Sequence, residues 1–244
     1  MFYQLMIRYG QFLFRYRNAL FPVVLLTLLI CFRPLPALGK YESDIWLNLA
    51  GILTVILGQI TRAAVIGLAY IKRGGKNKTI FANTLETNGI FAHCRNPLYL
   101  GNLLILAGFF IIHNNPMVYI IGGIFFLLSY RAIVVAEEAY LYGKFGKEYE
   151  DYCSAVNRWL PKFSGLPATV ASMEFNWSRV LAKDYTTMMT WFTTVMFILT
   201  EEHVYQYGLG DSYQFIIRIS CYVFLVMVFA FLVRTLKKHG RLAG

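Results

Sequence analysis

Residues 83–108, NTLETNGIFAHCRNPLYLGNLLILAG, decide the fold of this chain. The first half carries many hydrogen-bonding side chains, and the second half is an apolar run. Arg95-Asn96-Pro97 stands between the halves and predicts a helix start, because Asn is a favoured N-cap and Pro is tolerated in the first turn. The sequence therefore predicts polar groups at the mouth of a membrane helix.

Two adjacent carboxylates, Glu137 and Glu138, end a later apolar run and precede residues 145–161, FGKEYEDYCSAVNRWLP. Carboxylates are costly at the end of a membrane segment, and there they usually mark a functional site with a cationic or hydrogen-bonding partner. Taken alone, the pair could equally begin a solvated helix.

Composition places the chain among helical membrane proteins. Its 244 residues are 57% hydrophobic and 17% aromatic, with a mean hydropathy of +0.51, which is too apolar for a soluble domain. The net charge of +10 fits membrane topology, and no nucleic-acid motif accompanies it. The four cysteines lack Cys-x-x-Cys spacing, so neither a disulfide framework nor a zinc site is predicted.

The apolar runs predict an all-helical, polytopic fold with about six spans and a cytoplasmic-side pocket. A soluble segment, residues 137–184, separates the fourth and fifth spans, and Gly165-Leu166-Pro167 is the predicted boundary between a core, 1–165, and an extension, 166–244. The predicted spans are 19–32, 45–71, 98–112, 117–136, 186–199 and 215–233.

The distribution of Lys and Arg predicts the orientation. With six spans and a cytoplasmic N-terminus, the outer segments hold only Arg33 and Lys40 as basic residues. This asymmetry follows the positive-inside rule, so both termini and the neighbourhood of Asn83 and Glu137 are expected on the cytoplasmic side. A water-soluble cofactor could reach the site there.

Three blocks, in this order, carry a family resemblance: GIFAHCRNPLYLG at 89–101, EEAYLYGKFGKEY at 137–149 and RWLP at 158–161. Together they resemble the isoprenylcysteine carboxyl methyltransferases and phospholipid methyltransferases, which are integral-membrane enzymes that use S-adenosylmethionine. The resemblance covers about residues 79–163. It departs at Asn96, where the commonest form of the family has His.

The resemblance implies contacts with the cofactor S-adenosyl-L-methionine, and Arg95, Glu138 and His93 are the candidate catalytic residues. Taken alone, Arg95 reads as an anchor to anionic headgroups. His93 reads first as a hydrogen-bonded residue, although histidine titrates near neutral pH and could act as a base. The chain has no Gly-rich phosphate cradle, which suits a donor without phosphate. The implied cofactor contacts are Asn83, Thr84, Leu85, Glu86, Phe91, Asn96, Pro97, Leu98, Tyr99 and Glu137.

A second departure concerns the methyl acceptor. In the carboxyl methyltransferases an Arg one turn before the first Glu holds the substrate carboxylate, but Ile133 stands there in this chain. Arg131 is rotated about 200° from that position around the helix. A buried carboxylate must be paired, so we expect a lipid or other apolar acceptor without an isoprenylcysteine carboxylate. A phosphate would need a cation such as Arg62, Arg95 or Arg131, and Arg62 and Arg131 are the candidate substrate-binding residues.

Two alternatives remain open at this stage. Sterol-reductase-type membrane enzymes share an Arg-x-Pro-x-Tyr-x-Gly block and use NADPH, whose phosphate would suit the basic run Lys72–Lys78. A membrane scaffold without activity could also keep the fold. The sequence predicts no metal site and leaves open the acceptor and the oligomeric state.

Overall fold

A computed structural model describes residues 1–39, 44–69 and 79–242. The described part is built from helices, which confirms the predicted all-helical class. The basic run Lys72–Lys78 lies outside the described residues. The α-helices are α1 (Phe2–Cys31), α2 (Asp44–Leu68), α3 (Pro97–His113), α4 (Gly123–Phe145), α5 (Lys147–Ala155), α6 (Leu166–Ala171), α7 (Trp177–Asp211) and α8 (Tyr213–Lys238). Short 3-10 helices are η1 (Ala37–Gly39) and η3 (Gly89–Ala92), and η4 (Val118–Gly122) is a π-helical turn that leads into α4.

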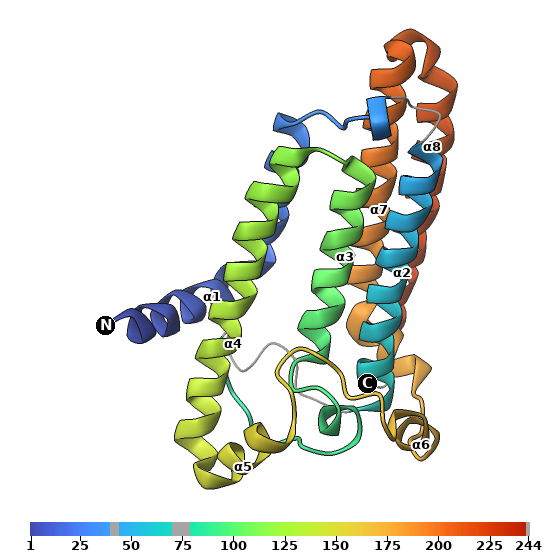
Figure 1. Ribbon diagram of the computed structural model, residues 1–244. Coiled ribbons are helices and arrows are strands. Elements are labelled where there is room, and N and C mark those ends of the chain that lie inside the picture. The colour runs from blue at the N-terminus through green and yellow to red at the C-terminus, as the bar shows by residue number, and fades with distance from the viewer. Residues whose placement is uncertain (40–43, 70–78, 243–244) are drawn as a thin grey trace.

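Most of the long helices run roughly parallel to one another along the long axis of the molecule (Figure 1). α1 packs against α4, α3 packs against α2, and α7 packs against α2, α3 and α8. The α3–α4 and α7–α8 connections lie at the upper end in Figure 1, whereas α5, α6 and the C-terminal end lie at the lower end. The segments that carry the three sequence blocks therefore meet at one end of the bundle.

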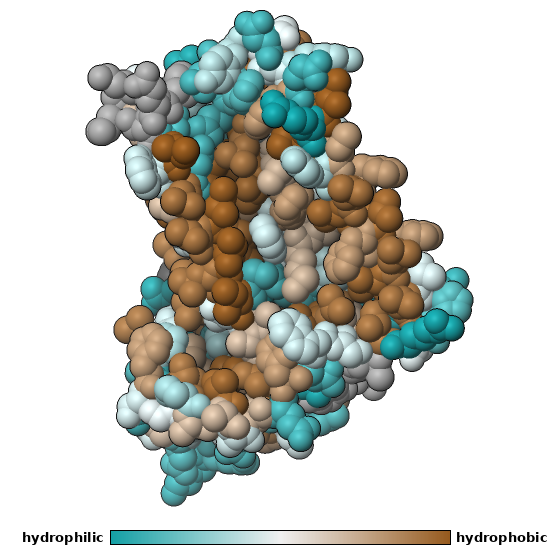
Figure 2. Space-filling model, turned by 90° about the vertical axis from the view of Figure 1, so that its right-hand side faces the viewer, coloured by the Kyte–Doolittle hydropathy of each residue, from teal (hydrophilic) through white to brown (hydrophobic). Residues whose placement is uncertain are grey.

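Four helical segments are long and apolar enough to cross a membrane: Tyr3–Cys31, Asp44–Leu68, Val118–Phe145 and Tyr213–Lys238. α3 is apolar but has only 17 residues. Hydrophobic side chains cover the middle of the face in Figure 2, and hydrophilic ones gather at both ends. This pattern is that of a protein whose central band lies in lipid.

Within the described residues, each of the six predicted runs contains a helix, but several bounds differ from the prediction, and two differences matter for the site. α4 continues past residue 136 to Phe145, so Glu137 and Glu138 lie inside a helix rather than at its end. α7 begins at Trp177 instead of residue 186. Hydropathy marks the residues that lipid can solvate, whereas a helix continues wherever its polar side chains find partners in the protein. Asp184, which is fully buried in α7, has such partners.

Glycines allow α2 and α3 to approach closely. Gly51 and Gly58 on α2 face Gly108 and Gly101 on α3, and a Cβ on Gly58 would lie 2.6 Å from the Gly101 carbonyl oxygen. Small residues at such spacing permit backbone contact between membrane helices. The contact fixes the start of α3, with its Pro97 at the first helical position, against the lower half of α2.

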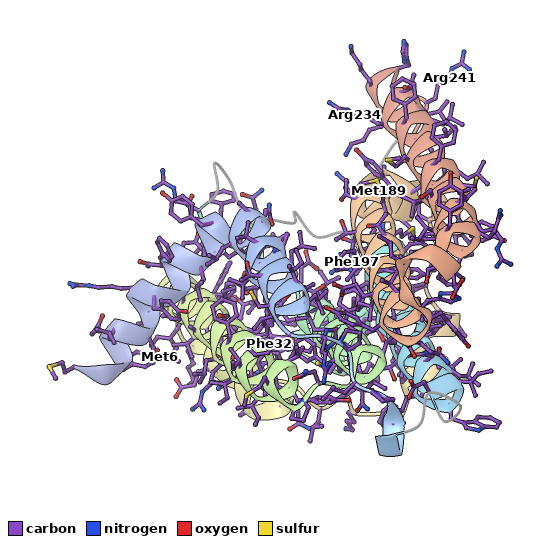
Figure 3. All side chains as sticks on the ribbon, turned by 90° about the horizontal axis from the view of Figure 1, so that it is seen from above. Met6, Phe32, Met189, Phe197, Arg234 and Arg241 are labelled. Atoms are coloured by element: carbon purple, nitrogen blue, oxygen red, sulfur yellow. The ribbon has the colours of Figure 1, made fainter. Side chains whose placement is uncertain are left out.

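α1 contains Pro22, and the start of the helix around Met6 projects away from the bundle (Figure 3). Proline inside a helix removes a backbone hydrogen bond and permits a bend. Below the bend, Gly10 packs directly on the Ala132 carbonyl of α4. Leu13 and Phe14 form a buried cluster with Ala132 and Ile133. This packing holds one face of α1 toward the bundle interior.

Candidate active site

A cavity of about 700 Å³ lies among α1, α3, α4 and α7. Seen from above in Figure 3, α1 and α4 lie on one side of α3, and α7 and α8 on the other. The lower end of the cavity is polar, and its upper part is lined by apolar side chains. The polar lining includes Arg17, Arg62, Arg95, Asn96, Tyr99, Asn102, Glu137, Lys183, Thr186, Thr187 and Thr190; the apolar lining includes Phe21, Leu25, Ile105, Leu106, Phe109 and Phe126.

A hydrogen-bonded chain of three side chains crosses the polar end. Arg17 Nη1 donates to the Tyr99 hydroxyl at 2.7 Å, and that hydroxyl donates to Glu137 Oε1 at 2.8 Å. The three residues come from α1, α3 and α4. Among the described residues, the hydrogen bond that Glu137 accepts comes from Tyr99 and uses Oε1. The second carboxylate oxygen, Oε2, is therefore available to a ligand.

Glu138 points to a different set of partners from its neighbour. Arg158 binds it through two bonds, Nε to Oε1 at 2.9 Å and Nη2 to Oε2 at 2.6 Å. Arg95 Nη2 lies 3.5 Å from Glu138 Oε1. Because consecutive helical residues project about 100° apart, Glu137 serves the cavity while Glu138 ties the following segment to α4.

The loop before α3 is bound to the segment after α5. Asn96 Nδ2 donates to the Arg158 carbonyl at 3.1 Å, and the Arg95 amide donates to the Asn157 carbonyl at 3.0 Å. Asn96 begins α3 as predicted, but its side chain does not cap the helix. Burial raises the pKa of the Tyr152 phenol, which therefore stays protonated and donates to the Phe91 carbonyl at 2.8 Å.

His93 is buried beside this segment and does not line the cavity. Its Nδ1 donates to the Lys162 carbonyl at 2.7 Å, and its Nε2 lies 2.9 Å from the Thr169 hydroxyl. Both ring nitrogens are thus engaged with the segment that precedes α7. The structure places His93 in the packing of that segment rather than at a reacting group.

Arg62 lines the cavity from α2 but is strongly paired. Its guanidinium binds the Asp184 carboxylate of α7, Asn102 of α3 and, at 3.1 Å, the Thr187 hydroxyl. Gln59 also donates to Asp184, at 2.9 Å. A buried Arg–carboxylate pair with further hydrogen bonds satisfies both charges. Arg62 therefore joins α2, α3 and α7 at the wall of the cavity.

The structure brings together most of the predicted cofactor contacts. The cavity is lined by Phe91, Asn96, Pro97, Leu98, Tyr99 and Glu137, together with Arg95 and Arg62. Asn83, Thr84 and Glu86 are exposed on the preceding loop, where Thr84 donates to Glu86 at 3.2 Å. Arg131 is exposed on α4. The residues outside the cavity lining are Asn83, Thr84, Leu85, Glu86, His93, Arg131 and Glu138.

The position of Ile133 changes the argument about the acceptor. Its side chain is fully buried against Leu13 and Phe14 of α1 and does not line the cavity. The missing Arg at this position therefore says nothing about charges inside the cavity of this protein. The cations that do line it are Arg17, Arg62, Arg95 and Lys183.

The sequence reasoning missed several polar residues, among them Arg17 and Asn102, which line the cavity, and Asp184, which binds Arg62. Asn102 follows Tyr99 by one helical turn, so a helical projection of α3 would have placed them together. Arg17 and Asp184 carry no such local signal, because each meets its partners across helices.

The sequence comparisons agree with this site. The family profile described as phospholipid methyltransferase matches residues 46–148, which run from α2 into α5. This part of the chain is therefore similar to the phospholipid methyltransferases. The matched residues include Arg62, Tyr99 and Glu137, whereas α1, α7 and α8 lie outside the match.

Several curated proteins are similar to the chain. The protein-S-isoprenylcysteine O-methyltransferase of Rattus norvegicus is 31% identical over 50% of this chain and 43% of the rat protein. The cobalt-zinc-cadmium resistance protein CzcN of Cupriavidus metallidurans is 31% identical over 52% of this chain and 54% of its own length. The nickel-cobalt-cadmium resistance protein NccN of Alcaligenes xylosoxydans xylosoxydans is 29% identical over 63% and 68%.

The chain therefore spans less than half the length of the rat methyltransferase that it matches. No solved structure matches the chain.

Proposed function

We propose that the protein is an integral-membrane methyltransferase that uses S-adenosyl-L-methionine to methylate a lipid or another apolar, membrane-embedded acceptor. The observation that carries this proposal is the two-part cavity. Its polar end is lined by residues 96–99, Asn-Pro-Leu-Tyr, and by Glu137. Its apolar part continues between α1 and α3. A polar cofactor and an apolar acceptor need such adjoining environments.

The residues present fit the cofactor. Its ammonium group needs an acceptor, which the available oxygen of Glu137 supplies; its adenine needs an apolar slot, for which Phe91 and Leu98 are at hand. Asn96 and Asn102 add amide groups to the same lining. When bound, the cofactor supplies an activated methyl group.

The chain's own residues then have separate tasks. Glu137, held by Tyr99, would orient the cofactor's amino-acid end, and the clamp of Arg158 on Glu138 would keep residues 156–162 over the loop before α3. Phe21, Leu25 and Leu106 would hold the acceptor's apolar part and exclude water. Positioning of this kind supplies much of the acceleration in a displacement reaction.

The first test is calorimetric titration of the detergent-purified protein with S-adenosylmethionine and, separately, with NADPH. We expect saturable binding of S-adenosylmethionine and none of NADPH. The opposite result would favour the reductase alternative, and binding of neither would favour a scaffold. Incubation with methyl-labelled cofactor and a membrane lipid extract then tests transfer, which should place the label in an apolar product.

A further inference from the structure

Arg17 lines the cavity and forms no ion pair with a carboxylate among the described residues. Arg62 is paired with Asp184, and Arg95 with Glu138. The hydrogen-bond partner of Arg17 is the neutral Tyr99 hydroxyl, and its guanidinium stacks 4.3 Å from the centre of the Phe14 ring. The Phe14 ring covers one face of the guanidinium, and the Tyr99 hydroxyl accepts from its Nη1. The other N–H groups of Arg17 can therefore donate to a ligand.

An apolar stripe continues from Arg17 along α1. Arg17, Phe21 and Leu25 follow one another at four-residue spacing and line the same cavity, so they lie on one face of the helix. Opposite them, α3 presents Tyr99 near Arg17, then Ile105 and Phe109 further up. The cavity thus offers a cation at one end and an apolar channel leading away from it.

The Tyr99 hydroxyl also separates two opposite charges. Glu137 accepts from it on one side and Arg17 donates to it on the other. Under the proposed function, Glu137 is taken by the ammonium of the cofactor, which leaves Arg17 facing the acceptor. A desolvated guanidinium favours an oxyanion, which it can bind with two parallel hydrogen bonds.

We propose that Arg17 is the anion-binding residue of the acceptor site, and that the acceptor is an anionic amphiphile whose carboxylate or phosphate lies at Arg17 with its apolar chain along Phe21 and Leu25. That the bound anion is the methyl acceptor rests on the proposed function. The anion site itself is inferred from the geometry of α1 alone. Because α1 lies outside the matched segment 46–148, the family profile does not contain this residue.

The test is binding of dodecanoate, dodecyl phosphate and dodecanol to the full chain in an uncharged detergent, without cofactor. The variants are Arg17→Met and the control Arg131→Met, which removes the same charge from an exposed position on α4. We expect Arg17→Met to weaken binding of at least one anion by about tenfold to hundredfold, since bonds to charged groups are of that strength. Dodecanol should bind both variants and the unmodified protein alike, and the control should bind the anions normally.

Two further variants keep the result decisive. Arg17→Lys should retain part of the anion affinity, and Tyr99→Phe should retain most of it, because the proposal assigns the anion to the guanidinium rather than to the phenol. Circular dichroism checks that each variant keeps its helices.

Equal anion affinity of Arg17→Met and the unmodified protein, or an equal loss in Tyr99→Phe and Arg17→Met, would overturn the proposal. Failure of S-adenosylmethionine to bind would instead overturn the proposed function while leaving the anion result intact. Selective loss of dodecanoate or of dodecyl phosphate would identify the anionic group.

Discussion

At the scale of single residues, neighbours in sequence have different tasks because of their helical positions. Glu137 lines the cavity and accepts from Tyr99, while Glu138 binds Arg158 and Arg95. The same division separates Asn96, which lines the cavity, from His93, whose ring is bound to Lys162 and Thr169. A sequence motif therefore locates the region of the site, but the tertiary structure decides which of its side chains line the cavity.

Glu137→Gln should lower the affinity for S-adenosylmethionine by about tenfold to hundredfold, because it removes a charge partner of the ammonium and preserves the shape of the side chain. Calorimetric titration measures the effect. Glu148→Gln, an exposed position on α5, is the matched control and should bind normally. Unchanged affinity in Glu137→Gln would remove Glu137 from the cofactor site.

Arg158→Met should loosen the loop before α3, because Arg158 holds that loop to α4 through Glu138. The side chain of Arg158 is 39% exposed, so we expect a loss of stability below about 1 kcal/mol. Amide hydrogen exchange of residues 89–97 should nevertheless become faster. Lys162→Met removes an exposed cation from the same segment and should leave the exchange as it is; faster exchange in both variants would mean that the clamp is not specific.

At the scale of elements, the contact between α2 and α3 sets the position of the site. Gly58 and Gly101 bring the two backbones together, and Arg62, one turn below Gly58, then reaches Asn102 of α3 and Asp184 of α7. Hydropathy alone could not place α7 in the core, because its polar beginning lowers the mean over the helix. Its packing on α2 and α3 depends on partners far away in sequence.

Gly58→Ala should destabilise the protein by about 1–3 kcal/mol, because the added methyl group overlaps the Gly101 carbonyl and neither backbone can move freely. Gly143→Ala has open space around the new methyl group and should raise stability by up to about 1 kcal/mol, since Ala favours a helix over Gly. Thermal unfolding in detergent compares the two. A rise in melting temperature for both would show that α2 and α3 pack less closely than the structure has them.

At the scale of the whole molecule, the charges predict which end faces the cytoplasm. α5 and the turn between α7 and α8 lie at opposite ends of the bundle in Figure 1. Single cysteines at Lys147 and Asp211, in a variant without the four native cysteines, should react with an impermeant maleimide from the inside and the outside, respectively. Labelling of the Asp211 position from the cytoplasmic side would refute the predicted orientation. Lys76, which is also predicted on the inside, lies outside the described residues.

The predicted boundary at residues 165 and 166 stays a prediction. In the structure, α7 follows this boundary, yet it supplies Lys183, Thr186, Thr187 and Thr190 to the cavity. The extension therefore contributes to the site whether or not it folds as a separate unit.

The sequence by itself determined the helical membrane class, the start of α3 at Pro97 and the neighbourhood of the site, because apolar length, proline position and motif order are properties of the chain. The tertiary structure alone decided that Glu137 and not Glu138 lines the cavity, that Ile133 packs against α1, and that Arg17 joins Tyr99. These outcomes depend on how α1 and α4 are rotated against each other, and that rotation follows from contacts such as Gly10 on Ala132, which no local pattern records.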